Sequence, residues 1–300
     1  MNGKPKNATF GFKRFICYIL AVVMAASATL FISVGITASL LRTNTFVQKR
    51  FEAYNSQLLK EVYNELGEVA KKTGIPKKAY TSAFSSKHMQ SALHIASNNV
   101  VKGYKTDYSE SGFLYDYCKN SITKYCKKND IPITNRQINQ YACFAVDAFN
   151  KVVGDESTNS IIIIALTYTN KPAFAMLFSV IAFILCIFLI DFISARRHKK
   201  YEYMGISFII SGEVMFVLPF FAIIMKYAND LHFTDVDVYN MALADTLNDI
   251  LKIIMAFGVL VLVLGVFLVV KNYRYYLHKA QSFNTEKQIV EKIKNEQTEK

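Results

Sequence analysis

The sequence predicts an all-α membrane protein, built from four transmembrane helices and a helical domain inserted between the first two. The main observation is a set of four apolar runs, each longer than the roughly 20 residues that a helix needs to cross a hydrocarbon core about 30 Å thick. A mostly polar stretch, residues 42–171, separates the first run from the second. The 300 residues include only 12 Gly and 5 Pro. These are too few for the many tight turns of a β-sandwich, which favours helices.

The apolar runs divide the chain into successive segments. In order these are a basic N-terminus (1–14), span 1 (15–41), the inserted domain (42–171), span 2 (172–193), a basic loop (194–203), span 3 (204–226), an acidic loop (227–249), span 4 (250–270) and a charged tail (271–300). The inserted domain is large enough to bury a core of its own, so we expect it to fold rather than to serve as a linker.

Span 1 allows two interpretations. Its basic start and the small residues Ala26-Ser27-Ala28 fit a cleaved signal peptide. Mostly apolar residues continue to Leu41, however, which favours an uncleaved signal anchor. We therefore expect span 1 to be retained.

The lysines and arginines beside the spans predict the orientation, because positive residues are retained on the cytoplasmic side. Basic residues precede span 1, separate spans 2 and 3 and follow span 4, whereas the connection between spans 3 and 4 carries aspartates. The residues are Lys4, Lys6, Lys13 and Arg14; Arg196, Arg197, Lys199 and Lys200; Lys271, Arg274 and Lys279; and Asp230, Asp235, Asp237, Asp245 and Asp249. The sequence thus predicts a plasma-membrane protein with both termini in the cytoplasm and with the inserted domain and the acidic loop outside.

Hydrophobic periodicity predicts several helices in the inserted domain. A helix over 45–72 ends where Gly74 can take the left-handed cap position and Pro76 cannot continue the turn. Further helices are expected up to Phe84 and over 86–101, 111–128, 134–153 and 161–168, the last closing the bundle on the membrane surface. The helix at 134–153 opens with a capping box of Thr134 and Gln137.

One six-residue pattern occurs twice in this domain. Lys71-Lys72-Thr73-Gly74-Ile75-Pro76 and Lys127-Lys128-Asn129-Asp130-Ile131-Pro132 each follow a predicted helix. A duplicated helical hairpin explains the repeat. Basic residues before a cap and a proline are also common at unrelated helix ends, so both interpretations stay open.

Cysteine and tyrosine carry two further alternatives. Cys118 and Cys126 lie eight residues apart on one predicted helix, about 12 Å along its axis, too far to bridge each other. Either could pair with Cys143, although three buried thiols are favoured. Tyrosines beside lysines could recognise glycans or anionic envelope polymers. At helical spacing, half-buried core tyrosines are the favoured interpretation.

Glu213 is the strongest single candidate for a functional residue. It lies about nine residues into span 3, roughly 13 Å along the helix and close to the bilayer midplane. A carboxylate there costs about 2.5–3.5 kcal/mol, so it is expected to be protonated, paired or facing a cavity. No Lys or Arg lies at a matching depth. The two open interpretations are a protonatable gate and a protonated side chain bonded to Ser or Thr on a neighbouring helix.

Small residues predict close packing between the spans. They are Ala21, Ala25, Thr29 and Ser33 in span 1, Ser207 and Ser211 in span 3, and Gly258 and Gly265 in span 4. Pro219 is expected to kink span 3 without ending it, because neighbouring helices can satisfy the freed carbonyl.

Three short motifs carry a resemblance to known proteins. They are Gly74-Ile75-Pro76 in a GIxKxxxxxxF-like turn, Tyr203-Met204-Gly205-Ile206-Ser207 followed by Ser211-Gly212, and Asn248-Asp249-Ile250-Leu251. On these motifs nearly the whole chain resembles a group of uncharacterised four-span membrane proteins from clostridia-like Gram-positive bacteria, with a helical outer domain after span 1. The resemblance implies the architecture and a Gram-positive source but no activity.

The order of elements also resembles that of ABC-type permeases of the cell-division and lipoprotein-release kind. These place one large outer domain between spans 1 and 2 of four, and their basic loop after span 2 precedes a Met and a Gly. Here Arg196 and Arg197 are followed by Glu202, Met204 and Gly205, at a different spacing, and the outer domain is expected to be all-helical rather than mixed. The resemblance implies a cytoplasmic ATPase as partner, with Arg196, Arg197 and Glu202 at the contact.

The residues therefore predict an integral membrane protein that binds or senses an envelope component or partner protein through its outer domain. The alternative is a membrane subunit of an ABC-type transport or mechanotransmission complex. Enzymatic activity and cofactors are not expected, because the sequence has no HExxH, GxSxG, P-loop or Gly-rich dinucleotide motif. Asp235-Val236-Asp237 lacks the Gly and final Glu of an EF-hand. The basic segments favour anionic lipid over nucleic acid as their partner.

Overall fold

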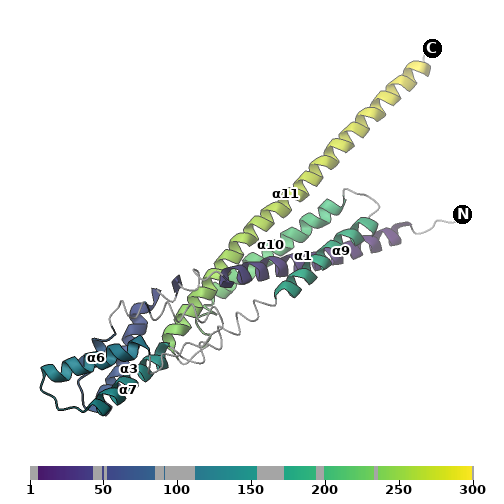
Figure 1. The fold of residues 1–300 in the computed structure, drawn as a ribbon. Helices are drawn as coiled ribbons and strands as arrows, with labels where there is room; N and C mark the ends of the chain where they lie inside the picture. The colour runs from purple at the N-terminus through teal and green to yellow at the C-terminus, as the bar shows by residue number, and fades with distance from the viewer. Residues whose placement is uncertain are drawn as a thin grey trace. The chain divides into compact units, whose positions relative to one another are not determined.

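The computed structural model describes residues 6–42, 49–50, 53–84, 91, 112–153, 172–193, 199–232 and 236–298. Every regular element in these ranges is a helix (Figure 1). The chain divides into two compact units. We call Met1–Gly35, Ala173–Phe221 and Leu251–Lys300 the span unit, and Ile36–Pro172 with Ala222–Ile250 the inserted unit.

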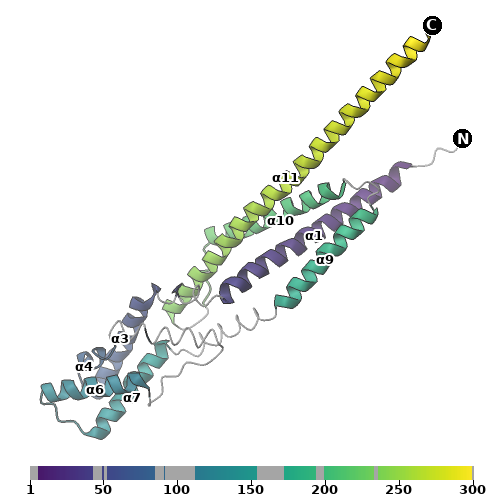
Figure 2. The same ribbon diagram turned by 45° about the horizontal axis from the view of Figure 1, so that its top comes forward.

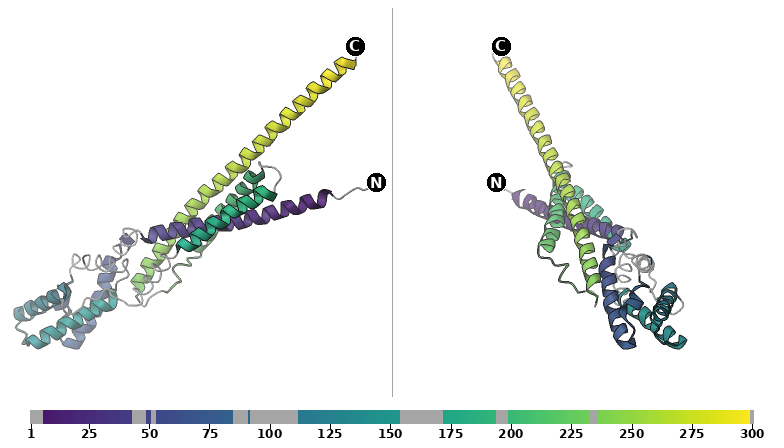
Figure 3. Two further views of the ribbon diagram at one scale, coloured as in Figure 1. Left: turned by 45° about the vertical axis from the view of Figure 1, so that its right-hand side comes forward. Right: turned by 90° about the vertical axis from the view of Figure 1, so that its left-hand side faces the viewer.

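Four helices are long and apolar enough to cross a membrane, which makes the chain a multi-pass membrane protein by the length and composition of its helices. They are α1 (Lys6–Arg42), α9 (Pro172–Ile193), α10 (Lys199–Ile224) and α11 (Asp237–Thr298). The prediction of an all-helical chain with four long apolar helices is confirmed. Figure 3 shows α11 as the longest of them, unbroken over 62 residues.

The ends of α10 and α11 differ from the expected segments. The structure is helical from Asp237, so most of the expected acidic loop at 227–249 belongs to α11. Hydropathy detects only the part of a helix that suits hydrocarbon, and no Gly or Pro between Asp237 and Phe257 stops the helix earlier. Similarly, α10 begins at Lys199, inside the expected basic loop, and ends at Ile224. The exposed Lys226, with a φ of 53°, then lies in the following turn.

Two pairs of glycines bring α10 and α11 into backbone contact. A Cβ added to Gly212 would lie 2.6 Å from the Leu262 nitrogen and 2.7 Å from the Gly258 oxygen, and one added to Gly205 would lie 3.0 Å from the Gly265 oxygen. The pairing of Gly205 with Gly265 and of Gly212 with Gly258 runs antiparallel. Such small-residue contacts replace the hydrophobic driving force that lipid does not supply between helices.

The remaining helices of the span unit pack on α10. Cys17, Ala21 and Met24 of α1, Cys186 and Ile190 of α9, and Tyr203 of α10 form one buried cluster. The hydroxyls of Thr29 and Ser211 lie 3.0 Å apart and link α1 to α10, and the rings of Phe183 and Phe208 stack between α9 and α10. Pro219 lies inside α10 without ending it, as expected.

The inserted unit is a bundle of four described helices that is completed by the start of α11. The helices are α3 (Asn55–Thr73), α4 (Lys77–Thr81), α6 (Phe113–Lys128) and α7 (Asn135–Val153) (Figure 2). α7 packs against α3 and α6, and α4 packs against the same two helices. Their apolar faces share one core with Val238, Tyr239 and Ala242 of α11.

Local signals in the sequence explain the ends of these helices. Gly74 has a φ of 70°, and its N–H donates to the Ala70 carbonyl at 3.0 Å. The capping box forms as predicted, because the Thr134 N–H donates to Gln137 Oε1 at 3.0 Å and the Gln137 N–H donates to Thr134 Oγ1 at 3.3 Å. The helix expected at 45–72 is interrupted by a turn at Tyr54. The helices expected at 86–101 and 161–168 lie outside the described residues, apart from a helical Ser91.

The repeated six-residue pattern extends into the core. Leu58, Val62 and Leu66 precede Gly74 at the same spacings at which Leu114, Cys118 and Ile122 precede Asp130, and all six side chains are buried. Asp130 also matches Gly74 in conformation, with a φ of 50°. A non-glycine residue adopts this region rarely, so the shared backbone supports a duplicated helical hairpin.

Substitution of Gly212 by Ala tests the glycine contact. The added methyl meets backbone atoms that cannot rotate away, so we expect the free energy of unfolding to fall by about 1–3 kcal/mol. A thiol-reactive dye that reports exposure of the buried Cys17 and Cys186 on heating measures this change. Gly11→Ala is the matched control, because nothing lies within 4 Å of its added Cβ. If Gly212→Ala and Gly11→Ala melted at the same temperature, the result would contradict the glycine contact between α10 and α11.

Candidate functional site

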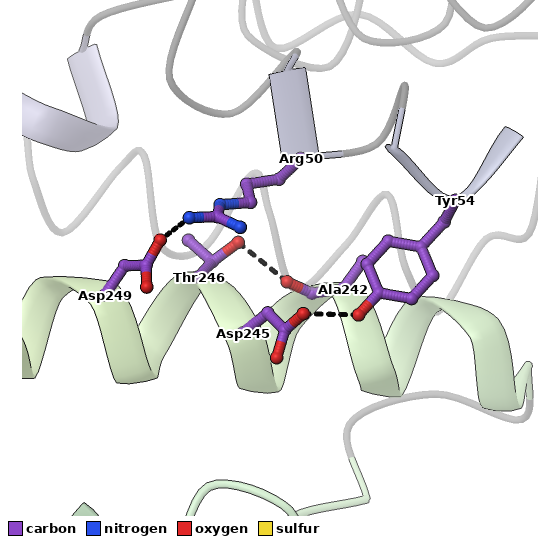
Figure 4. Close-up of polar contacts among 6 residues, drawn as sticks. All are labelled: Arg50, Tyr54, Ala242, Asp245, Thr246 and Asp249. Carbon is purple, nitrogen blue, oxygen red and sulfur yellow. Dashed lines mark hydrogen bonds and ion pairs between the residues drawn. The ribbon is translucent and has the colours of Figure 1, made fainter.

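A polar contact joins the approach to α3 with the first turns of α11 in the inserted unit. The Arg50 guanidinium forms an ion pair with Asp249, and the Tyr54 hydroxyl donates a hydrogen bond to Asp245 Oδ2 (Figure 4). The two aspartates lie one helical turn apart and so present their carboxylates on one face of α11. We call Arg50, Tyr54, Asp245 and Asp249 the α11 latch.

The backbone around Tyr54 places its side chain for this contact. Its carbonyl accepts the N–H groups of Gln57 at 3.0 Å and Leu58 at 2.9 Å, which starts α3. On α11, the hydroxyl of Thr246 donates to the Ala242 carbonyl at 2.7 Å and is satisfied within its own helix. The latch therefore depends on the two aspartates for its acceptors.

Electrostatics keep Tyr54 in its donating form. Burial raises its pKa to about 12, the hydrogen bond and charge of Asp245 act in the same direction, and the charge of Arg50 opposes them. The phenol is therefore protonated at any physiological pH. The pKa of Tyr54 in the folded state exceeds the ordinary value of 10. The protonated hydroxyl therefore stabilises the fold fully below pH 10, and this contribution is lost as the pH rises towards 12.

Two buried amide oxygens flank the latch in the sequence. Asn55 follows Tyr54 and Asn248 precedes Asp249, and the Oδ1 atom of each accepts no hydrogen bond from the described residues. A buried acceptor without a donor costs about 1–3 kcal/mol. A rearranged contact that supplied donors to these oxygens would recover this cost.

The structure places Glu213 on the outer surface of the span unit, where it is exposed. Ser211, the nearest hydroxyl in sequence, is instead engaged with Thr29. Within the described residues Glu213 has no hydrogen bond to Ser or Thr, so the interpretation as a carboxyl bonded to a neighbouring helix receives no support from the contacts.

The expected cytoplasmic contact is only partly described. Arg196 and Arg197 lie outside the described residues. Glu202 lies half-buried in the first turn of α10, where a carboxylate interacts favourably with the positive end of the helix dipole. The contact of these three residues with a cytoplasmic partner therefore stays a prediction.

Three described tyrosines of the inserted unit have structural roles. The Tyr63 hydroxyl donates to the Phe84 carbonyl at 2.8 Å, the fully buried Tyr80 bonds the Thr73 hydroxyl at 2.6 Å, and Tyr239 donates to the Val153 carbonyl at 3.0 Å. These contacts favour core tyrosines over a surface for glycans.

A surface depression lies where α6 ends and α7 begins. It has a volume of about 490 Å³ and is lined by Thr123, Cys126, Lys127, Asp130, Ile131, Pro132, Ile133, Asn135 and Ile138. Exposed Lys127 and Asp130 provide charges beside the side chains of Ile131, Ile133 and Ile138.

The five cysteines, all of them in the described residues, form no disulfide. Cys118 and Cys126 are buried, and Cys143 is half-buried. Burial raises the pKa of Cys118 to about 12 and that of Cys126 above its ordinary value, so both are unreactive thiols. In the part of the chain that the structure describes, no group of three or more His, Cys, Asp or Glu side chains is arranged to hold a metal ion.

No protein-family model, curated protein or solved structure matches this chain. The latch is the part of the site that sequence reasoning misses, because hydropathy alone places Asp245 and Asp249 in a loop. Their spacing of four residues beside an apolar run was the available signal for one helix face.

Replacement of Tyr54 by Phe tests the latch. Loss of a hydrogen bond to a charged acceptor is expected to lower the local opening free energy by about 1–2 kcal/mol. Hydrogen exchange at the Gln57 and Leu58 amides should then be roughly 5- to 30-fold faster. Tyr227→Phe is the control, since this tyrosine is 62% exposed. Unchanged exchange in Tyr54→Phe would show that the latch does not hold the start of α3.

Proposed function

We propose that this protein is a plasma-membrane sensor of a Gram-positive bacterium. Its inserted unit binds an envelope component or a partner protein outside the cell, and α11 carries the resulting change to a cytoplasmic C-terminal tail. Both termini are cytoplasmic in this proposal, as the basic residues beside the spans predict. The protein acts by binding and not by catalysis.

One observation carries this proposal. α11 is a single helix from Asp237 to Thr298, and it contributes to both units. Val238, Tyr239 and Ala242 belong to the core of the inserted unit, whereas Gly258 and Gly265 belong to the glycine contact of the span unit. A helix without a break transmits rotation or translation along its length better than a jointed connection does.

The latch is the element that this signal would change. The Tyr54 hydrogen bond contributes about 1–2 kcal/mol, so its rearrangement is accessible to the binding energy of a ligand. The unsatisfied oxygens of Asn55 and Asn248 lower the cost of a second arrangement. The depression between α6 and α7 is the proposed binding site for the ligand. Helix α7 packs on α3, and Tyr54 of the latch directly precedes α3, so these two helices connect the depression to the latch.

The alternative function is a membrane subunit of an ABC-type transport or mechanotransmission complex. Its support is the order of elements and the basic residues 194–200 ahead of Glu202 in the first turn of α10. A cytoplasmic ATPase would contact this segment.

Transmission through α11 is tested by breaking the latch and probing α11 beyond its glycine contact with α10. We expect Asp249→Arg to change the rate of maleimide labelling at a Tyr273→Cys site on α11, and to leave a Tyr201→Cys site on α10 unchanged. Both tyrosines are exposed, at 63% and 49%, so their accessibilities are comparable at the outset. The full chain without the added cysteine gives the background. No change at position 273, or an equal change at both positions, would contradict transmission by α11.

Purification in mild detergent distinguishes the proposed sensor function from the alternative of a permease subunit. We expect the tagged full chain to retain an envelope protein, or no protein, when mass spectrometry identifies what accompanies it. A stoichiometric ATPase that is lost on replacement of Arg196 and Arg197 by Glu would establish the alternative. Lys226→Glu in the turn after α10 is the control for loss of a basic side chain.

A further inference from the structure

One carboxyl in the span unit takes no part in the proposed transmission. Glu213 lies in the apolar stretch Tyr201–Ile224 of α10 and is exposed on the surface of the span unit. Exposed side chains at this depth of a membrane helix meet hydrocarbon, where a carboxyl without a partner is costly. The surface that carries Glu213 is therefore expected to be covered by protein.

The other faces of α10 are already occupied. Gly205 and Gly212 contact α11, Ser211 contacts α1, and Phe208 stacks on α9. None of these contacts includes Glu213. Beside it in sequence are the outward apolar side chains of Val214, Val217, Leu218 and Phe221, which are 37%, 41%, 65% and 52% exposed. We call these five residues the Glu213 face.

No Lys or Arg lies at the depth of Glu213. In the four spans the basic residues nearest to this depth are Lys226, 13 residues further along the chain, and Lys252, six residues before the Gly258 that contacts Gly212. A protonated carboxyl, in contrast, is self-complementary, because its O–H donates while its second oxygen accepts. A second copy of the chain has the same topology and therefore brings the same group to the same depth on the same face.

We infer that the Glu213 face is a homodimer interface within the membrane. The Glu213 carboxyls of two copies hydrogen-bond to each other across a two-fold axis normal to the bilayer, and the surrounding Val, Leu and Phe side chains pack between the copies. A two-fold interface uses one patch on both partners, which a self-complementary group satisfies. This inference uses residues other than those of the latch and does not depend on the proposed function.

The test measures association of the full chain in lipid vesicles. Copies labelled with donor or acceptor dyes are reconstituted at decreasing protein-to-lipid ratios, and energy transfer gives the dimer dissociation constant. We expect Glu213→Leu to raise this constant about 3- to 30-fold, the range that interhelical hydrogen bonds in membranes cover. Glu213→Gln should associate like the wild type, because an amide also donates and accepts. Leu264→Ala, at an exposed position of α11, is the control.

Cross-linking identifies the face that is used. Oxidation of Val217→Cys should give a disulfide-linked dimer, whereas Leu264→Cys should not, and the wild type reports any contribution of the native thiols. Thermal unfolding of each variant excludes misfolding as the cause of a lost dimer.

Three outcomes would overturn the inference. These are a monomer at every lipid ratio, a dimer that Glu213→Leu leaves unchanged, and cross-linking through position 264 in place of 217. If the chain is monomeric and Glu213→Leu instead releases a different membrane protein that carries an intramembrane Lys or Arg, then that protein and not a second copy covers the face.

Discussion

The continuity of α11 is the constraint on which both units depend. Each residue of an α-helix is turned about 100° from the one before it, so the faces that a helix presents along its length are fixed relative to one another. Ala242, Asp245 and Asp249 must face the inserted unit, and Gly258 and Gly265 must face α10.

The two sets are held by different physical interactions. The glycines act through shape, because a backbone within reach of another backbone gains van der Waals contacts that any side chain would prevent. The latch acts through an ion pair and a hydrogen bond between half-buried side chains.

The exposure of Glu213 is the observation behind the proposed dimer. Its carboxyl lies on a surface of Val, Leu and Phe side chains, and hydrocarbon cannot satisfy it. In a water-soluble domain the same exposure would carry no information, because water would solvate the group. The meaning of an exposed residue thus depends on which solvent surrounds its helix.

The sequence by itself determined the elements whose signals are local. Apolar length predicted the four membrane helices, with the bounds of α9 as expected, and a glycine, a proline and a capping box predicted the helix ends at Thr73 and Asn135. Only the tertiary structure decided the extent of α11, the pairing of Gly205 and Gly212 with α11, and the meeting of Arg50 and Tyr54 with two aspartates. These features depend on which helix faces meet. A contact between segments nearly 200 residues apart in the chain produces no periodic sequence pattern that would predict it. Hydropathy indicates whether a segment suits hydrocarbon or water, but it does not indicate which other segment a side chain contacts.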